Sequence, residues 1–315
     1  MNPLSASLSL SHDVRRTLPV RIPFLETPAT GALQNELLEA MESGQLMLHY
    51  QPQVRIADGR IAAVEALLRW NHPTFGPITP MLFLPRIERL PFMHVLTQWV
   101  ILSALEQATY WRASGTELRV AVNIAPATAE DPLFPEWLHD IVSKSGVNPS
   151  TLELEITERC AIQHWQRATR VLHRVARSGV RIAIDDFGAG YSPLSHLRDF
   201  PVSQLKIDRS LVTSLAECSR TESIFCSILD LARRLSIEVV PEGVENEDVL
   251  NVLRRAGCIV AQGYYLGEPM ERRRIETAFA GRLGYGSFSA EKPTPRPQKR
   301  KARRRLPEAK SAVRR

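Results

Sequence analysis

Carboxylate and amide side chains recur at the ends of short apolar, β-branched segments of this chain. They are Glu65, Asn123, Glu155, Glu158, Asp185, Asp186, Asp208, Glu242, Glu245 and Gln262. A carboxylate within an apolar strand is costly to bury unless it is paired or holds a metal. A single such strand would fit a solvent-facing edge, but five strands with acidic residues at corresponding positions do not. Their recurrence predicts a divalent-cation site.

The donor types in this set narrow the choice of metal. Carboxylates with one amide oxygen, and no histidine among them, favour Mg²⁺ or Mn²⁺ over Zn²⁺. The adjacent Asp185 and Asp186 suit a site where one carboxylate bridges two ions and its neighbour binds the second. Two ions about 4 Å apart typically hold the attacking and leaving oxygens of a phosphoryl transfer. The residues therefore predict two-metal phosphoryl chemistry.

A lysine accompanies these acidic groups. Lys206 lies two residues before Asp208, so both side chains point to the same side of a strand. The lysine could stabilise phosphate charge or orient a nucleophilic water. It could equally form a salt bridge that holds the carboxylates apart, and both interpretations stay open.

Eight predicted strands alternate with amphipathic helices between Gly31 and Gly281. The strands are Leu48–Val54, Ile61–Trp70, Arg119–Ala125, Thr151–Thr157, Arg181–Phe187, Gln204–Asp208, Glu238–Val244 and Ile259–Leu266, and the helical patterns include Leu33–Met41, Val95–Arg112, Glu136–Ser143, His164–Ser178, Ser223–Leu235 and Asp248–Ala256. This α/β arrangement predicts a (β/α)₈ barrel, which places catalytic residues at the carboxyl ends of its strands. The first connection, Ile56–Arg60, is too short for a helix and predicts a hairpin. A doubly wound open sheet is the alternative.

The charge is concentrated at the C-terminal end of the chain. Residues 291–315 contain eleven Lys or Arg against two Glu, whereas residues 1–290 contain 29 basic and 32 acidic residues, a net charge of −3. We expect a leader or linker over 1–30, the barrel over 31–281 and a disordered basic tail over 282–315. The tail could aid solubility, or it could bind nucleic acid, anionic lipid or an acidic protein.

Several classes of protein are excluded by composition. The 44% hydrophobic content argues against a chain that is disordered throughout. No run of eighteen apolar residues predicts a membrane span, and no basic segment leads into an apolar run as in a secretory signal. The four cysteines form no CxxC pair. We therefore expect a reduced, cytoplasmic protein.

Seven motifs in order resemble the EAL-domain family of cyclic di-GMP phosphodiesterases. They are Tyr50-Gln51-Pro52, EALLRW at 65–70, LELEITE at 152–158, DDFGAGYS at 185–192, LKID at 205–208, EGVE at 242–245 and QGYYLGEP at 262–269. The combination is specific and covers residues 33–275. The resemblance implies a modified TIM barrel whose first strand is antiparallel, in agreement with the short first connection.

The resemblance also implies metal-dependent hydrolysis of cyclic di-GMP to linear pGpG. Carried over by motif, one Mg²⁺ or Mn²⁺ ion would be held by Glu65, Asn123, Glu155 and Asp185, and a second by Asp185, Asp186 and Glu242. Glu242 and Lys206 match the pair that orients or deprotonates the attacking water. Such an enzyme lowers the second messenger and thereby regulates motility, biofilm or virulence-gene expression.

Further residues match the family's substrate and supporting positions. Gln51, Leu67 and Arg69 match positions that contact the nucleotide, and the guanidinium of Arg69 suits a phosphate. Supporting positions are matched by Asp208, Gln262, Glu158 and Glu245. Glu158 corresponds to an anchor of the loop from Asp186 to Ser192, which in the family couples the site to a homodimer interface. A homodimer is therefore expected.

The sequence departs from the family pattern at a few positions near the site. Ala189 and Pro193 alter the loop, Arg159 follows EITE, and Pro241 fixes φ and removes a backbone donor just before Glu242. No ligand position is lost.

The alternative function is a catalytically weak or inactive sensor of cyclic di-GMP that acts through protein or nucleic-acid contacts.

Overall fold

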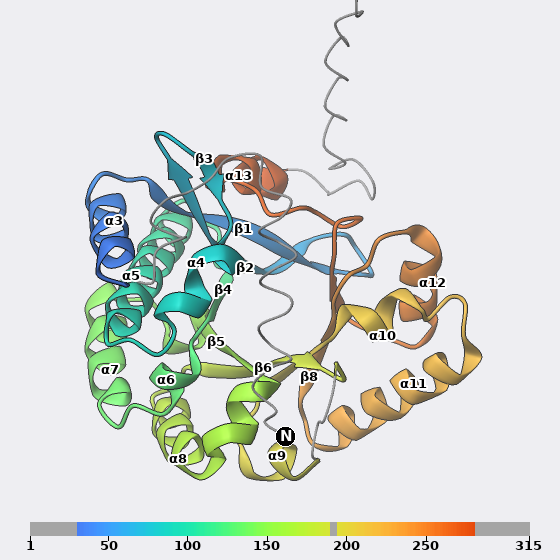
Figure 1. The fold of residues 1–315 in the computed structure, drawn as a ribbon. Helices are drawn as coiled ribbons and strands as arrows, with labels where there is room; N and C mark the ends of the chain where they lie inside the picture. The colour runs from blue at the N-terminus through green and yellow to red at the C-terminus, as the bar shows by residue number, and fades with distance from the viewer. Residues whose placement is uncertain (1–29, 190–193, 281–315) are drawn as a thin grey trace, which may run out of the picture.

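The strands of the protein form a ring with helices around its outside (Figure 1). The computed structural model describes residues 30–189 and 194–280, apart from the side chains of residues 30, 158–165, 194–196 and 279–280. Hydrogen-bonded neighbours follow the order β8-β7-β6-β5-β4-β2-β1-β9, and β3 pairs with β2 outside this path. The architecture is a modified TIM barrel.

The elements alternate along the chain as the sequence predicts. The strands are β1 (Leu46–Arg55), β2 (Ile61–His72), β3 (Gly76–Ile78), β4 (Arg119–Asn123), β5 (Leu152–Thr157), β6 (Arg181–Phe187), β7 (Gln204–Ile207), β8 (Glu238–Pro241) and β9 (Val260–Gln262). The helices are α3 (Thr30–Glu42), α4 (Pro80–Ile87), α5 (Phe92–Ala113), α6 (Pro126–Ala129), α7 (Phe134–Ser145), α8 (Glu158–Arg177), α9 (Leu194–Asp199), α10 (Arg209–Thr213), α11 (Ser219–Arg234), α12 (Glu247–Arg255) and α13 (Arg272–Ala280), with a 3₁₀ turn at Pro149–Thr151.

The predicted hairpin and the antiparallel first strand are both confirmed. β1 pairs antiparallel with β2 on one side and with β9 on the other, whereas β2 and β4 to β8 run parallel. All eight predicted strands and all six predicted helices are present. The sequence analysis did not name β3 or the helices α4, α6, α9, α10 and α13. Of these, β3 and the helices α6, α9 and α10 are too short to show a clear period.

The barrel closes at a seam between β8 and β9. The Val244 N–H, just beyond β8, donates to the Gln262 carbonyl at 3.1 Å, and the Tyr265 N–H donates to the Val244 carbonyl at 3.0 Å. A Cβ on Gly263 would lie 2.2 Å from the Val244 nitrogen, so this approach requires glycine. The open-sheet alternative is therefore wrong.

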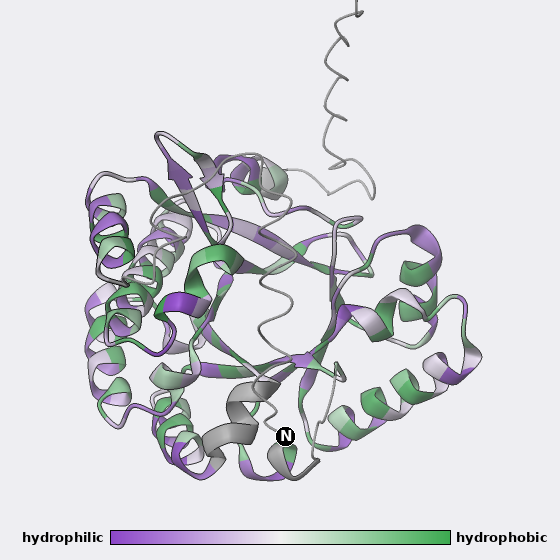
Figure 2. Ribbon diagram, viewed as in Figure 1, coloured by the Kyte–Doolittle hydropathy of each residue, from purple (hydrophilic) through white to green (hydrophobic). Residues whose placement is uncertain are grey.

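Apolar residues between the strands and the surrounding helices form one continuous core. The helices alternate between hydrophobic and hydrophilic residues along their length, as Figure 2 shows, and their apolar sides pack inward. Helix α5 buries Trp111, whose ring meets that of Tyr50 on β1 edge to face at 5.0 Å between centroids. In the described part of the chain, no helix is long and apolar enough to cross a membrane.

Paired charges fill the amino end of the barrel. Glu153 on β5 is fully buried, and its carboxylate accepts hydrogen bonds from Arg181 Nε at 3.0 Å and Gln204 Nε2 at 2.8 Å. The carboxylate of Glu238 on β8 forms ion pairs with Arg119 Nη1 at 2.9 Å and with Arg181 Nη2 at 2.8 Å. Five strands are thereby joined through their side chains.

We expect Glu153→Ala to lower the free energy of unfolding by about 3 kcal/mol, because it leaves buried guanidinium charge without its carboxylate. Urea denaturation followed by circular dichroism measures this loss. Glu136→Ala is the matched control, since Glu136 pairs with Arg174 on the exposed side of α7 and should change stability little. Equal losses in the two variants would show that the buried network contributes no more than a surface pair.

Candidate active site

The side chain of Lys206 stands at the centre of a carboxylate cluster at the opposite end of the barrel. Its Nζ lies 2.8 Å from Glu242 Oε1, 2.9 Å from Glu155 Oε1, 3.1 Å from Glu65 Oε2 and 3.3 Å from Asp185 Oδ1. The lysine is 1% exposed. Carboxylates from four places along the sequence thus converge on one buried ammonium group, as the sequence predicts for strand ends in a barrel.

The protonation equilibria of this cluster are coupled. Burial alone would lower the pKa of Lys206, but the surrounding carboxylates outweigh it and raise the pKa well above its usual value. Burial also favours the neutral form of Glu65, yet Lys206 and donated hydrogen bonds hold its pKa below the ordinary value. The pKa of Glu155 is raised well above normal by burial and by the nearby charge of Glu65. One ammonium therefore does not neutralise the whole cluster.

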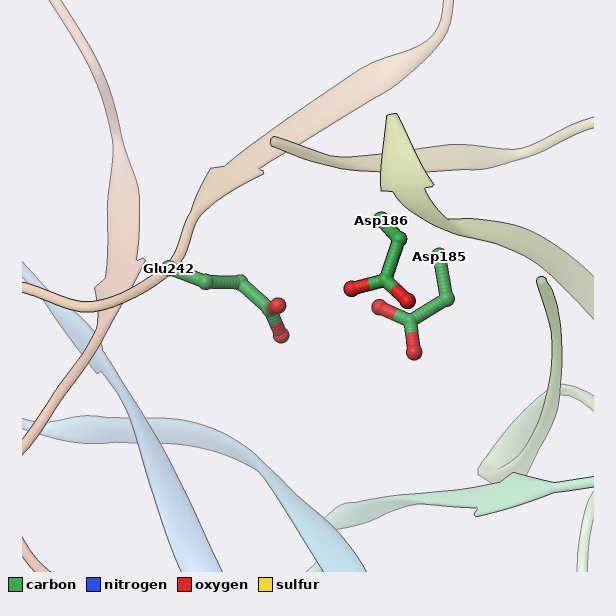
Figure 3. A group of neighbouring side chains, drawn as sticks. All are labelled: Asp185, Asp186 and Glu242. Carbon is green, nitrogen blue, oxygen red and sulfur yellow. The ribbon is translucent and has the colours of Figure 1, made fainter. Parts of the chain in front are cut away.

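Asp185 and Asp186 both present their carboxylates to Glu242, although consecutive strand residues normally face opposite sides (Figure 3). Asp186 has φ of 57°, and the β6–β7 register shifts between Ile184 and Phe187. This irregularity turns Asp186 toward the site. Carboxylate oxygens of Asp185, Asp186 and Glu242 lie within 4.8 Å of one another.

Burial raises the pKa of Glu242 to about 8 and that of Asp186 to about 6.

Amide side chains orient Glu65. Asn123 Nδ2 donates to Glu65 Oε1 at 2.8 Å and to Glu155 Oε2 at 3.2 Å. Gln262 Nε2 donates to Glu65 Oε2 at 2.6 Å and to Gln51 Oε1 at 3.1 Å, while Gln51 Nε2 donates to the Gly267 carbonyl at 3.2 Å. The bond between Gln51 and Gln262 spans 211 residues, so no local spacing could have revealed it.

The two other predicted nucleotide-contacting residues continue the inner face of β2 above Glu65. Leu67 and Arg69 follow Glu65 at intervals of two residues, and both are partly exposed. The Arg69 Nη1 donates to the Leu68 carbonyl at 2.8 Å, and burial lowers the pKa of the guanidinium group. These positions are compatible with ligand contact above the carboxylates.

The predicted supporting residues do not all reach the cluster. Asp208 caps α10, where its carboxylate accepts from the Ser210 N–H at 2.8 Å. Glu245 is exposed and pairs with Arg209, away from Lys206. The side chain of Glu158 lies outside the described residues, as do loop residues 190–193.

The proline next to Glu242 does not interrupt the strand. Pro241 is paired with Ile207 as the last residue of the β7–β8 ladder. The following residue, Glu242, donates its N–H to the Ile207 carbonyl at 3.0 Å. The missing N–H of Pro241 therefore leaves the backbone position of Glu242 fixed.

The donor set fits hard divalent cations. Five carboxylates, Glu65, Glu155, Asp185, Asp186 and Glu242, surround a single lysine charge. Glu155 Oε1 and Asp185 Oδ1 are buried and accept no hydrogen bond, although each lies near the Lys206 ammonium. Buried oxygens with excess negative charge suit Mg²⁺ or Mn²⁺.

The raised pKa of Glu242 predicts that the metal-free protein loses stability as pH rises. The folded protein retains this proton up to about pH 8, whereas the unfolded chain releases it near its ordinary pKa of 4.5. Between these values the folded state binds more protons, so the free energy of unfolding declines. Urea titrations with a chelator should show this decline from about pH 5 to about pH 8, and Glu242→Gln should make it shallower, with the remaining slope due to Glu155 and Asp186. An unchanged slope in the variant would contradict the assignment.

The chain matches proteins that share this arrangement. The model of the EAL domain covers residues 34–269. An uncharacterized signaling protein of Caulobacter vibrioides is 41% identical over 75% of this chain and 29% of its own length. Cyclic di-GMP phosphodiesterase PA2567 of Pseudomonas aeruginosa is 37% identical over 73% of this chain and 39% of its own length. The chain therefore spans roughly a third of the length of these relatives.

A solved structure confirms the fold. The PaMucR phosphodiesterase, determined as a c-di-GMP complex, superposes with a TM-score of 0.72 at 38% identity, over 78% of this chain and 99% of that one. The family model, the relatives and the structure all match the barrel that carries the carboxylate cluster. The chain belongs to the EAL domain family.

Proposed function

We propose that the barrel hydrolyses one phosphodiester bond of cyclic di-GMP and releases linear pGpG. The observation that carries this proposal is the convergence of five carboxylates and one lysine at the carboxyl end of the strands. Relatives named cyclic di-GMP phosphodiesterases and a phosphodiesterase structure with c-di-GMP support the choice of substrate.

Two Mg²⁺ or Mn²⁺ ions are the proposed cofactors. One would be held by Glu65, Asn123, Glu155 and Asp185, and the other by Asp185, Asp186 and Glu242. When bound, such ions supply charge stabilisation for the phosphoryl oxygens and activate water. The Asn123 amide donates both observed bonds through nitrogen, which leaves its oxygen available as a ligand.

Lys206 and Glu242 are the proposed pair that prepares the attacking water. Their charged atoms are 2.8 Å apart, so the lysine orients the Glu242 carboxylate toward the cluster. A carboxylate in this place can accept a proton from water as the nucleophile forms. Of the two interpretations of Lys206, the salt bridge is present in the structure, and the role in water orientation is proposed with it.

We expect Glu65→Gln to reduce kcat at least about a hundredfold, because even indirect partners of metal ligands cost ~10–100-fold in activity or metal affinity. Chromatographic detection of pGpG, with Mg²⁺, Mn²⁺ or chelator, provides the measurement. Lys206→Ala should lower kcat more than it weakens binding of cyclic di-GMP. Glu247→Gln, an exposed carboxylate in the first turn of α12, is the control.

The same assay separates the proposed enzyme from its alternative. Metal-dependent pGpG production that is lost in Glu65→Gln supports the phosphodiesterase. Tight binding of cyclic di-GMP without turnover by the unaltered protein would instead establish the sensor function. Substantial turnover by Glu65→Gln would overturn the metal assignment.

We further propose that the chain acts in the cytoplasm as a homodimer and lowers cyclic di-GMP, with effects on motility, biofilm or virulence-gene expression. The basic residues 291–315 would then bind an anionic partner: nucleic acid, a membrane surface or an acidic protein. Sedimentation of the full chain should give twice the monomer mass. DNA titration should show salt-sensitive binding that a chain ending at Ala290 lacks. A monomer, or equal DNA affinity of both chains, contradicts the respective proposal.

A further inference from the structure

Tyr50 and Gln51 of β1 fix the segment that follows β9 across the mouth of the barrel. The Tyr50 N–H donates to the Met270 carbonyl at 2.7 Å, and the Met270 N–H donates back at 3.0 Å. The Gln51 side chain donates to the Gly267 carbonyl, and the Pro269 backbone lies beside the His49 ring. Because backbone and side-chain bonds both contribute, this segment is held next to β1 at the mouth.

His49 lies one layer above the carboxylate cluster, on the inner face of β1. In the β1–β2 register Gln51 is opposite Glu65, and His49 is opposite Leu67. Side chains two residues apart on a strand share a face and are separated by about 7 Å along it. Directly opposite residues have Cβ atoms about 5 Å apart. His49 therefore lies beside Leu67, at the height of the proposed nucleotide-contacting residues.

The chemistry of the His49 ring differs from that of its neighbours in this wall. Partial burial and the charge of Arg69 lower the pKa of His49, and Glu271 opposes this shift. A neutral imidazole donates through one nitrogen and accepts through the other. Whichever nitrogen carries the proton, the neutral ring of His49 offers the other as an acceptor.

The neighbouring side chains of β1 and β2 do not supply an equivalent acceptor. Leu67 is apolar, and the Arg69 guanidinium is a donor only. The Gln51 side-chain oxygen already accepts a hydrogen bond from Gln262, and its nitrogen donates one to the Gly267 carbonyl. Met47, opposite Arg69, has only a weakly accepting thioether. His49 is thus the strong acceptor among these wall residues.

We propose that His49 reads the base of the nucleotide by accepting a hydrogen bond from the N1–H or N2 amino group of guanine. This inference rests on the proposed function, because it assigns a specificity residue to the same site. Guanine presents these two donors side by side on one edge. Adenine presents a lone pair at N1 and no amino group at C2, so an acceptor in this position disfavours it.

The test compares His49→Phe, which keeps a ring and removes both nitrogens, with His49→Gln, which retains a donor and an acceptor. Steady-state kinetics of the full chain would use cyclic di-GMP, cyclic di-AMP and the base-free diester bis(p-nitrophenyl) phosphate. His49→Phe should raise KM for cyclic di-GMP about fivefold to tenfold, the effect of one lost neutral hydrogen bond, with kcat little changed. The preference for guanine over adenine should fall by a similar factor, and His49→Gln should restore most of it.

The base-free substrate distinguishes base reading from support of the backbone at Pro269. Its hydrolysis should be the same in His49→Phe as in the unaltered protein and in His139→Phe, a control on the exposed side of α7. Equal losses on all substrates would mean that His49 only holds the backbone, and an unchanged guanine preference would mean that it does not contact the base. Either result overturns the proposal.

Binding measurements separate this proposal from the proposed function. If the unaltered protein hydrolyses none of the substrates, the proposed function fails, and calorimetric affinity for cyclic di-GMP then decides the role of His49. A fivefold to tenfold weaker affinity in His49→Phe, restored in His49→Gln, supports base reading without turnover. Equal affinities, or no binding by the unaltered protein, overturn it.

Discussion

The burial of one ammonium group among four carboxylates is the constraint on which the rest of the structure depends. An isolated lysine at 1% exposure would lose its proton or destabilise the fold, and isolated carboxylates there would be protonated. Each charge is tolerable only because strand ends far apart in sequence deliver its partners within about 3 Å. Closure of the barrel at the β8–β9 seam is therefore required by the electrostatics of the site as well as by packing.

Alternation along the strands points charged side chains into both ends of the barrel. The charges balance at the amino end but not at the carboxyl end. Glu153 and Glu155 both point inward from β5, two residues apart. At the amino end Glu153 meets guanidinium and amide donors, so its charge is matched. At the carboxyl end Glu155 shares one lysine with other carboxylates, so negative charge remains. That excess, which the described residues at the other end do not show, suits cations.

Irregular backbone is concentrated where the site needs it. The positive φ of Asp186 and the register shift in β6 place two consecutive carboxylates on the same side. Gly263 permits the contact with Val244 that closes the seam beside Gln262. Each departure costs conformational or packing freedom, and each positions a side chain of the cluster or its amide partners. Regular strands supply most of the scaffold, and these exceptions complete the site.

The sequence alone predicted the alternation of strands and helices, the hairpin at β1 and the carboxylates at the strand ends, because period-two patterns and buried acidic residues are local signals. It could not place the short helices, whose few residues show no period. It also could not show that Asp186 turns inward, that Gln51 bonds Gln262 or that His49 stands opposite Leu67. Those facts depend on register and on contacts between residues far apart in the chain, which only the closed barrel brings together.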